Sequence, residues 1–199
     1  RKLSKEQWNA IKEEGGAVTL RLAELYKAGV RPESAEAQAA IAALNPGVTV
    51  EVIPHRLGEA DMPPLVARVN LVLDATDNYP ARFALNRACI AAGVPLVSAA
   101  AVRAEGQLSV FDPLRGGPCY RCLYPDSADL TALSCSESGV LAPLVGVLGS
   151  LQAMEALKLL AGYGQTLRGK LLLLDLRSMD IRQLSLPPRP DCPDCGHLR

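Results

Sequence analysis

The chain has 199 residues, of which 49% are hydrophobic, so it is long and apolar enough to bury one sizeable core. Its 21 Lys and Arg balance its 21 Asp and Glu, which excludes a global charge field that would attract nucleic acid or an anionic membrane. We therefore expect a single soluble domain over residues 1–199, with no nucleic-acid partner and no membrane partner.

The first 44 residues predict helices, because apolar positions recur at helical spacing in segments 4–14, 17–28 and 33–44. Gly15 and Gly16 separate the first two segments. The first residues of the chain are charged and lack the apolar core of a signal peptide, so a cytoplasmic location is expected.

Strands and helices then alternate along the chain. A strand is predicted at 48–53, a helix at 61–69, a strand from residue 71, a helix at 80–92, and strands at 94–98 and 107–111. This order is typical of an α/β fold, and we expect a doubly wound, mainly parallel sheet with helices on both faces. Residues 112–138, rich in Pro, Gly and polar residues, predict a long functional loop.

The longest apolar run, residues 140–161, approaches the length that spans a membrane. Gln152, Glu155 and Lys158 interrupt it, which favours a buried core or interface helix over a membrane span. An interface helix would make a homodimer the expected assembly. Residues 171–176 and 181–186 predict a closing antiparallel pair of strands.

The strand that begins at residue 71 is the feature around which the chain is organised. It is apolar without alternation, as in strands buried on both faces, and it ends in the polar residues Asp77 and Asn78. Ligands of open α/β sheets bind beyond the carboxyl ends of the strands, so Asp77 is a candidate for handling a metal or a phosphate. The alternative is that Asp77 or Asn78 only caps the helix that begins near Pro80.

Four of the six cysteines form two Cys-x-x-Cys pairs, Cys119 with Cys122 and Cys192 with Cys195. Two such pairs can give four thiolates to one tetrahedral ion, which favours a structural Zn²⁺ that ties the carboxyl-terminal tail to the loop after residue 111. Two local redox pairs or an iron–sulfur cluster are the alternatives.

The other two cysteines differ in their surroundings. Cys89 lies in an apolar helical segment and is expected to be inert packing. Cys135 lies between two serines in the polar loop, where a thiol has no packing role. It could act as a nucleophile, or it could be a free loop cysteine without a role.

Several ordered blocks of the sequence together resemble one known family. The blocks are residues 71–78, 94–97, 105–107, 117–122, 135–140, 149–156 and 192–196. In this order they are similar to the adenylyltransferases that activate ubiquitin-like sulfur-carrier proteins, the bacterial molybdopterin- and thiamine-pathway relatives of ubiquitin-activating enzymes. The resemblance covers residues 32–196.

The resemblance implies an enzyme that takes ATP and the carboxyl-terminal glycine of a small sulfur-carrier protein, and makes an acyl-adenylate with loss of pyrophosphate. It places a catalytic, Mg²⁺-binding aspartate at Asp77, Asn78 beside the nucleotide, and the zinc ligands at the four paired cysteines. A carboxylate attacks ATP poorly unless metal and cationic groups neutralise the phosphate charge, which is the role implied for Asp77. Cys135 matches a family cysteine that bonds covalently to the carrier in some members and is dispensable in others.

The amino-terminal part departs from the family pattern. Gly15 and Gly16 resemble the end of the family's Gly-rich nucleotide loop, but no buried strand precedes them, and the second strand and the Arg segment have no counterpart. Glu33 falls where the family usually has a lysine for ATP. Either segments of the nucleotide-loop region are missing from this sequence, or the chain is a truncated relative that no longer adenylates. The exposed sheet edge that truncation would leave favours the first.

Two other functions stay open. A non-catalytic relative would bind a carrier or partner subunit without using ATP. A nicotinamide-dependent oxidoreductase of the same fold class would explain a glycine-led helix, but the two cysteine pairs speak against it.

Overall fold

The computed structural model describes residues 50, 51, 53, 55–125 and 139–198. The chain divides into two compact units, Arg1–Arg56 and Leu57–Arg199, and every helix and strand described below belongs to the second. The helices predicted before residue 45 lie outside the described residues, and so do Gly15, Gly16 and Cys135.

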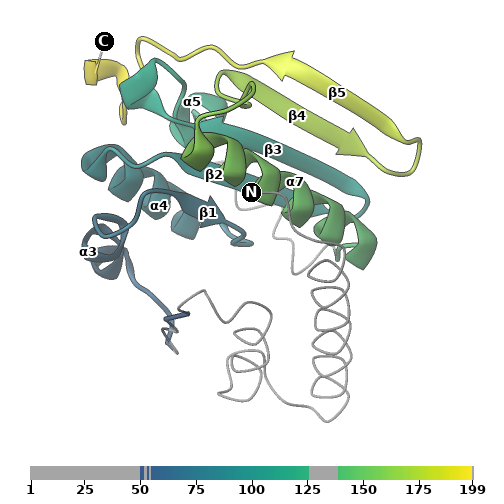
Figure 1. Cartoon of the computed structure of the whole chain (residues 1–199), viewed down its shortest axis with the longest axis horizontal. Coiled ribbons are helices and arrows are strands. Elements are labelled where there is room, and N and C mark those ends of the chain that lie inside the picture. Colours follow the sequence, from purple (N-terminus) through teal and green to yellow (C-terminus); the bar gives the residue numbers. More distant parts are fainter. Residues whose placement is uncertain (1–49, 52, 54, 126–138, 199) are drawn as a thin grey trace, which may run out of the picture. The chain divides into compact units, whose positions relative to one another are not determined.

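A five-stranded sheet forms the centre of the second unit (Figure 1). Its strands are adjacent in chain order: β1 (Val72–Asp74), β2 (Leu96–Val102), β3 (Glu105–Phe111), β4 (Lys170–Asp175) and β5 (Asp180–Ser185). The helices are α3 (Met62–Val66), α4 (Tyr79–Ala92), α5 (Tyr120–Leu123) and α7 (Ala142–Ala161). Short 3-10 turns lie at Glu59–Asp61, Pro113–Arg115 and Gly196–Leu198.

The sheet is mixed. β1 and β2 are parallel, whereas β2–β3, β3–β4 and β4–β5 are antiparallel. For the described residues the prediction of a mainly parallel sheet is therefore wrong. Short connections follow β2 and β4, and tight turns join antiparallel neighbours, which explains the β2–β3 and β4–β5 pairs. The parallel pair β1–β2 is joined by a crossover through α4. The predicted antiparallel pair at the carboxyl end is confirmed.

Hydrophobic clusters lie on the two faces of the sheet, because successive residues of β2 point to opposite sides. Leu96 packs in a cluster with Phe83 of α4 and Met62 of α3. Its neighbour Val97 packs in a second cluster with Leu144 of α7. Helices therefore cover both faces of this sheet (Figure 1).

Helix α4 has well-defined caps at both ends. The Asn78 side chain accepts a hydrogen bond from the backbone N–H of Ala81 at 2.9 Å, and Pro80 lies in the first turn. Gly93 ends the helix in the left-handed conformation, with φ of 69°. The capping role is thus filled by Asn78, and Asp77 lies just before the cap.

β1 is the edge strand of the described sheet, and the prediction that it is buried on both faces is wrong there. Leu73 is 49% exposed, whereas Asp74 is fully buried. Burial on both faces needs elements on both sides of a strand, and in the described part only β2 pairs with β1.

Some predicted elements differ from the structure, and the strands predicted at 94–98 and 107–111 are β2 and β3, each seven residues long. Residues 50, 51 and 53, from the predicted strand at 48–53, have no regular structure. The helix expected at 61–69 is shorter, since α3 ends at Val66.

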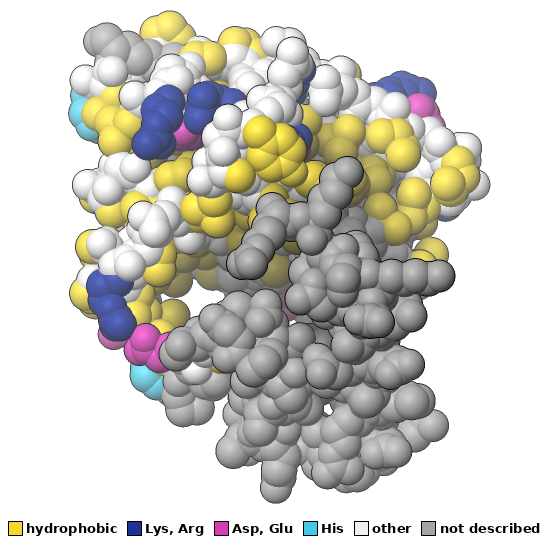
Figure 2. All heavy atoms as spheres, viewed as in Figure 1, with side chains coloured by type: hydrophobic (Ala, Val, Ile, Leu, Met, Phe, Trp, Pro, Cys, Tyr) yellow, Lys and Arg dark blue, Asp and Glu magenta, His cyan; other side chains and the backbone are white. Residues whose placement is uncertain are grey.

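Helix α7 carries the longest apolar run. By length and composition alone it could cross a membrane, although such a helix also occurs in the core of soluble proteins. Leu144 and Leu148 pack against the sheet, and the buried Glu155 pairs with Lys158. The outward side leaves apolar side chains such as Leu157 exposed, and Figure 2 shows hydrophobic side chains at the surface of this part of the molecule.

Candidate functional site

Asp77 lies in the turn between β1 and α4, at the carboxyl end of the strand. Its side chain is exposed, and its Oδ1 accepts a hydrogen bond from Asn78 Nδ2 at 3.2 Å. An ionised carboxylate has two oxygens with several lone-pair sites, so this single contact leaves capacity to bind a cation.

Asp77 lines two cavities. The larger, of about 380 Å³, combines residues of both charges with polar and aromatic side chains, namely Asp77, Asn78, Tyr79, Arg82, Arg103, Glu105, Gln107 and Tyr124. The smaller, of about 190 Å³, shares Asp77 and Arg82 and is lined mostly by small apolar residues of β2 and α7. The candidate site therefore lies at strand ends, where α/β sheets bind their ligands.

A buried polar network lies behind Asp77, and reasoning from the sequence missed it. Its members are Asp74, Thr76, Arg82, Ser98 and Gln152. Asp74, Arg82 and Gln152 are 0%, 5% and 5% exposed, so these polar side chains are held away from water. The available signal was an acidic residue at the end of an apolar strand, together with a glutamine in an apolar helix.

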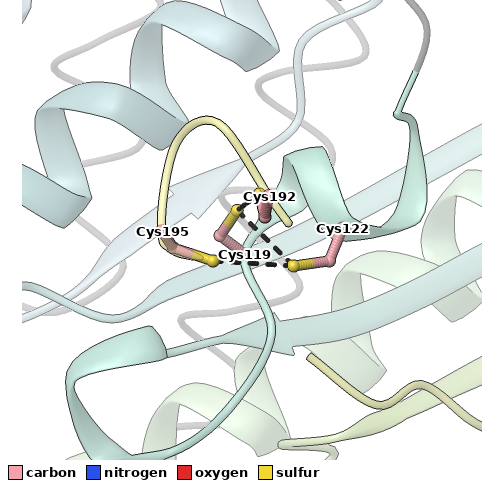
Figure 3. Close-up of side chains that lie close together, drawn as sticks. All are labelled: Cys119, Cys122, Cys192 and Cys195. Atoms are coloured by element: carbon pink, nitrogen blue, oxygen red, sulfur yellow. Dashed lines mark hydrogen bonds between the residues drawn. The ribbon is translucent and has the colours of Figure 1, made fainter. Parts of the chain in front are cut away.

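The four paired cysteines form a second candidate site, away from the strand ends. Cys119 and Cys122 flank the start of α5, and Cys192 and Cys195 lie in the carboxyl-terminal tail. All four side chains are buried and point toward one another, as Figure 3 shows. Their Sγ atoms all lie within 4.8 Å of one another.

The sulfur separations fit a single tetrahedral ion. Four sulfurs bound at about 2.3 Å would lie roughly 3.8 Å apart. The Sγ separations are 3.9 Å for Cys119–Cys122, 3.5 Å for Cys119–Cys192 and 3.6 Å for Cys122–Cys195. These residues can therefore hold one metal ion, and four thiolates would leave no open position on it.

The thiols differ in acidity when no ion is bound. Burial raises the pKa of Cys119 above its ordinary range, and it raises the pKa of Cys195 to about 11. At Cys122 burial also acts to raise the pKa, but hydrogen bonds outweigh it, and the pKa is lowered on balance. One of these bonds comes from the backbone N–H of Arg189, at 3.4 Å from the Cys122 Sγ.

Helix α4 connects with both cysteine pairs through Asn86, which is 1% exposed. Its Oδ1 accepts a hydrogen bond from Tyr120 N at 2.8 Å, next to Cys119. Its Nδ2 donates to Asp194 Oδ2 at 2.8 Å, between Cys192 and Cys195. One buried amide therefore ties the two pairs to the helix that begins beside Asp77. The sequence offered no signal for this contact.

Cys89 lies in the cluster formed with α3 and α4. Burial, helped by the charge of Asp74, raises the pKa of Cys89 to about 12. Its position agrees with the expected packing role. Gly15, Gly16 and Cys135 are outside the described residues, so their predicted roles stay predictions.

Known proteins share this fold and much of this sequence. The model of the ThiF family matches residues 26–194, and that of the TipAS antibiotic-recognition domain matches residues 1–49. Among solved structures, Escherichia coli MccB bound to MccA-N7isoASN superposes with a TM-score of 0.69 at 20% identity, over 81% of this chain and 51% of that one. This likeness shows a shared fold.

Three relatives are much closer in sequence. The molybdopterin-synthase adenylyltransferase of Escherichia coli is 46% identical over 83% of this chain and 66% of its own length. The sulfur carrier protein adenylyltransferase of Thermus thermophilus is 44% identical over 83% and 63%. The sulfur carrier protein ThiS adenylyltransferase of Escherichia coli is 42% identical over 83% and 65%.

The protein has an α/β fold with a mixed sheet, an acidic residue at a strand end and a cluster of four cysteines. The chain belongs to the ThiF family, which confirms the resemblance drawn from its ordered motifs. It spans 63–66% of the length of these three relatives. Gly15 and Gly16 precede the residues that match the ThiF family.

Proposed function

We propose that this chain is an ATP-dependent adenylyltransferase that acts on the carboxyl-terminal glycine of a small ubiquitin-like sulfur-carrier protein. Membership of the ThiF family and 42–46% identity to proteins named for this activity support the proposal. The observation that carries it is the position of Asp77, an exposed carboxylate between two cavities at the end of β1.

In the proposed reaction an oxygen of the carrier carboxylate bonds to the α-phosphorus of ATP, and the bond to pyrophosphate breaks. Asp77 would hold Mg²⁺, which when bound neutralises phosphate charge that repels the attacking carboxylate. Asn78 would lie beside the nucleotide while its side chain caps α4. Gly15 and Gly16 would contact the phosphates as the end of a Gly-rich loop.

Exchange of labelled pyrophosphate into ATP, measured with candidate carriers, tests this function. Asp77→Asn should lower the exchange rate by about 100-fold or more, because the metal loses an anionic ligand. Folding should be unaffected, since the Asp77 side chain is exposed. The matched control is Asp180→Asn, the same change at an exposed ion pair with Arg182 on the β4–β5 hairpin. Near wild-type exchange by Asp77→Asn would contradict the proposed role.

A second function has an observation in its favour. Gly15 and Gly16, the predicted end of the nucleotide loop, precede the residues that match the ThiF family, which are 26–194. A relative without a complete nucleotide loop would bind a carrier or partner without using ATP. Carrier binding together with no pyrophosphate exchange would identify this case.

We further propose that the four cysteines hold one structural Zn²⁺. The sulfur separations and the closed set of four thiols support it. Elemental analysis should find one zinc per chain, and Cys192→Ser should lower both zinc content and stability. Well under one equivalent in freshly purified protein would refute the assignment, and iron with sulfide would identify a cluster instead.

Cys135 is proposed as a thiol that attacks the carrier adenylate. Its sulfur would bond to the carrier carbonyl carbon and AMP would leave, so a thioester adduct should form only with ATP and carrier present. Hydroxylamine should cleave the adduct, and Cys135→Ala should abolish it while pyrophosphate exchange survives. No adduct in the wild type would make the cysteine a bystander.

The assembly is proposed to be a homodimer in the cytoplasm, with no nucleic-acid or membrane partner. The exposed apolar side chains of α7, including Val147, Leu157 and Leu160, support the dimer. Sedimentation should give twice the chain mass, and Leu157→Glu should give the monomer mass. A wild-type monomer would refute this assembly.

A further inference from the structure

Arg82 of α4 forms hydrogen bonds to the turn that carries Asp77, residues 75–78, from the buried side of this turn. Arg82 Nε donates to Thr76 O at 3.2 Å, and Arg82 Nη2 donates to the same oxygen. This oxygen belongs to the peptide group that leads directly into Asp77. Two N–H groups of one rigid, planar guanidinium therefore fix the orientation of that peptide.

Asp74 holds the same turn from the strand. Its Oδ1 accepts hydrogen bonds from Thr76 N at 2.9 Å and from Thr76 Oγ1 at 2.7 Å. Its Oδ2 accepts from Ser98 Oγ at 2.7 Å and lies 3.8 Å from Arg82 Nε. Both the N–H and the carbonyl of Thr76 are thus bonded to buried charged groups, which makes this residue the anchor of the turn.

Helix α7 also reaches this network. Gln152 Nε2 donates to the carbonyl oxygens of Asp74 at 2.9 Å and Val97 at 2.8 Å. Side chains from α4, β2 and α7 therefore meet around Asp74 and Thr76, where β1 leads into the turn. The Asp77 side chain, in contrast, makes a single hydrogen bond to the described residues and lines both cavities.

We propose that Arg82 is a positioning residue for Asp77: it holds the turn in the conformation from which Asp77 acts. The inference rests on the proposed adenylation for its catalytic consequence, and on the contacts above for its structural one. Arg82 would act through the Thr76 peptide, because a functional side chain on a turn must be held within a fraction of an ångström to act efficiently.

The experiment compares Arg82→Gln with the wild type by amide hydrogen exchange and by pyrophosphate exchange. Amide hydrogen exchange in a peptide covering residues 75–78 should become about tenfold faster, while β2 and β3 keep their protection. The kcat for pyrophosphate exchange should fall by about 100-fold, with more Mg²⁺ needed for half-saturation and a smaller change in the KM for ATP. Loss of a residue with a merely structural role would not lower kcat and raise the Mg²⁺ needed for half-saturation while leaving the KM for ATP nearly unchanged.

The matched control is Arg87→Gln, five residues along the same helix. Arg87 is half exposed and pairs with the exposed Glu59, at 2.5 Å between Nη2 and Oε1. This variant should match the wild type in both measurements. Arg82→Lys should give an intermediate result, because an ammonium can donate to Thr76 O but lacks the two-pronged geometry.

Arg82→Gln leaves the buried Asp74 without its cation, and that variant could fail to fold. Asp74→Asn/Arg82→Gln removes both charges together and serves in its place. A folded variant with wild-type amide exchange at residues 75–78, or with wild-type kcat and Mg²⁺ dependence, overturns the inference. If the wild type shows no pyrophosphate exchange with any carrier, the proposed function fails, and amide exchange alone still decides whether Arg82 holds the turn.

Discussion

Replacing Asn86 by Ala removes the amide that joins α4 to both cysteine pairs. The substitution leaves the buried Tyr120 N–H without its acceptor, which costs about 1–3 kcal/mol. It also removes a hydrogen bond to the charged Asp194, worth roughly 1.5–3 kcal/mol. Both hydrogen bonds are made by one side chain, so the two losses need not add fully. We expect a loss of about 2–5 kcal/mol in the free energy of unfolding.

Urea denaturation at fixed zinc concentration measures this loss. Arg87→Gln, the neighbouring exposed position, should change the free energy of unfolding by less than about 1 kcal/mol. Transfer of the proposed Zn²⁺ to a chelator provides an independent measurement on the folded protein. Groups that orient metal ligands typically contribute 10- to 100-fold in metal affinity, so we expect Asn86→Ala to weaken zinc binding by about that factor.

A loss under about 1 kcal/mol together with wild-type zinc affinity would refute the reasoning. Backbone segments on either side of the cysteines would then hold the two pairs without help from α4. Asn86→Asp separates the two contacts, because its carboxylate can still accept from Tyr120 N–H but cannot donate to Asp194. It should be less stable than the wild type, since it places two carboxylates together.

Three further predictions concern the N-cap of α4, the packing of β3 against α7 and the burial of Cys89. Asn78→Ala should cost about 1 kcal/mol in urea denaturation, because it removes the N-cap of α4, and no loss would mean that the cap is not needed. Gly106→Ala should cost about 1–3 kcal/mol, because the new Cβ would lie 2.8 Å from the buried Leu148 side chain, whereas Gly146→Ala meets open space and should be neutral or stabilising. With a pKa of about 12, Cys89 stays a protonated thiol at pH 8, so iodoacetamide should label it only after unfolding; rapid labelling of folded protein would contradict its burial.

Features that depend on neighbouring residues were predictable from the sequence. The N-cap of α4 at Asn78 follows from a residue type that suits this backbone position. The two Cys-x-x-Cys pairs predict a metal site, because the spacing within each pair places its two thiols close together. The antiparallel pair of β4 and β5 follows from an apolar segment and an alternating segment joined by a short turn.

Features that depend on distant residues were decided by the tertiary structure. Cys119 meets Cys192 across 73 residues, Asn86 meets Asp194 across 108, and Gln152 reaches Asp74 across 78. No local pattern specifies such contacts, because they arise only when strand register and helix packing have placed the segments. The exposure of Leu73 and the mixed sheet have the same origin: an apolar run predicts a strand, but which elements pair with it and cover it is settled by the whole fold.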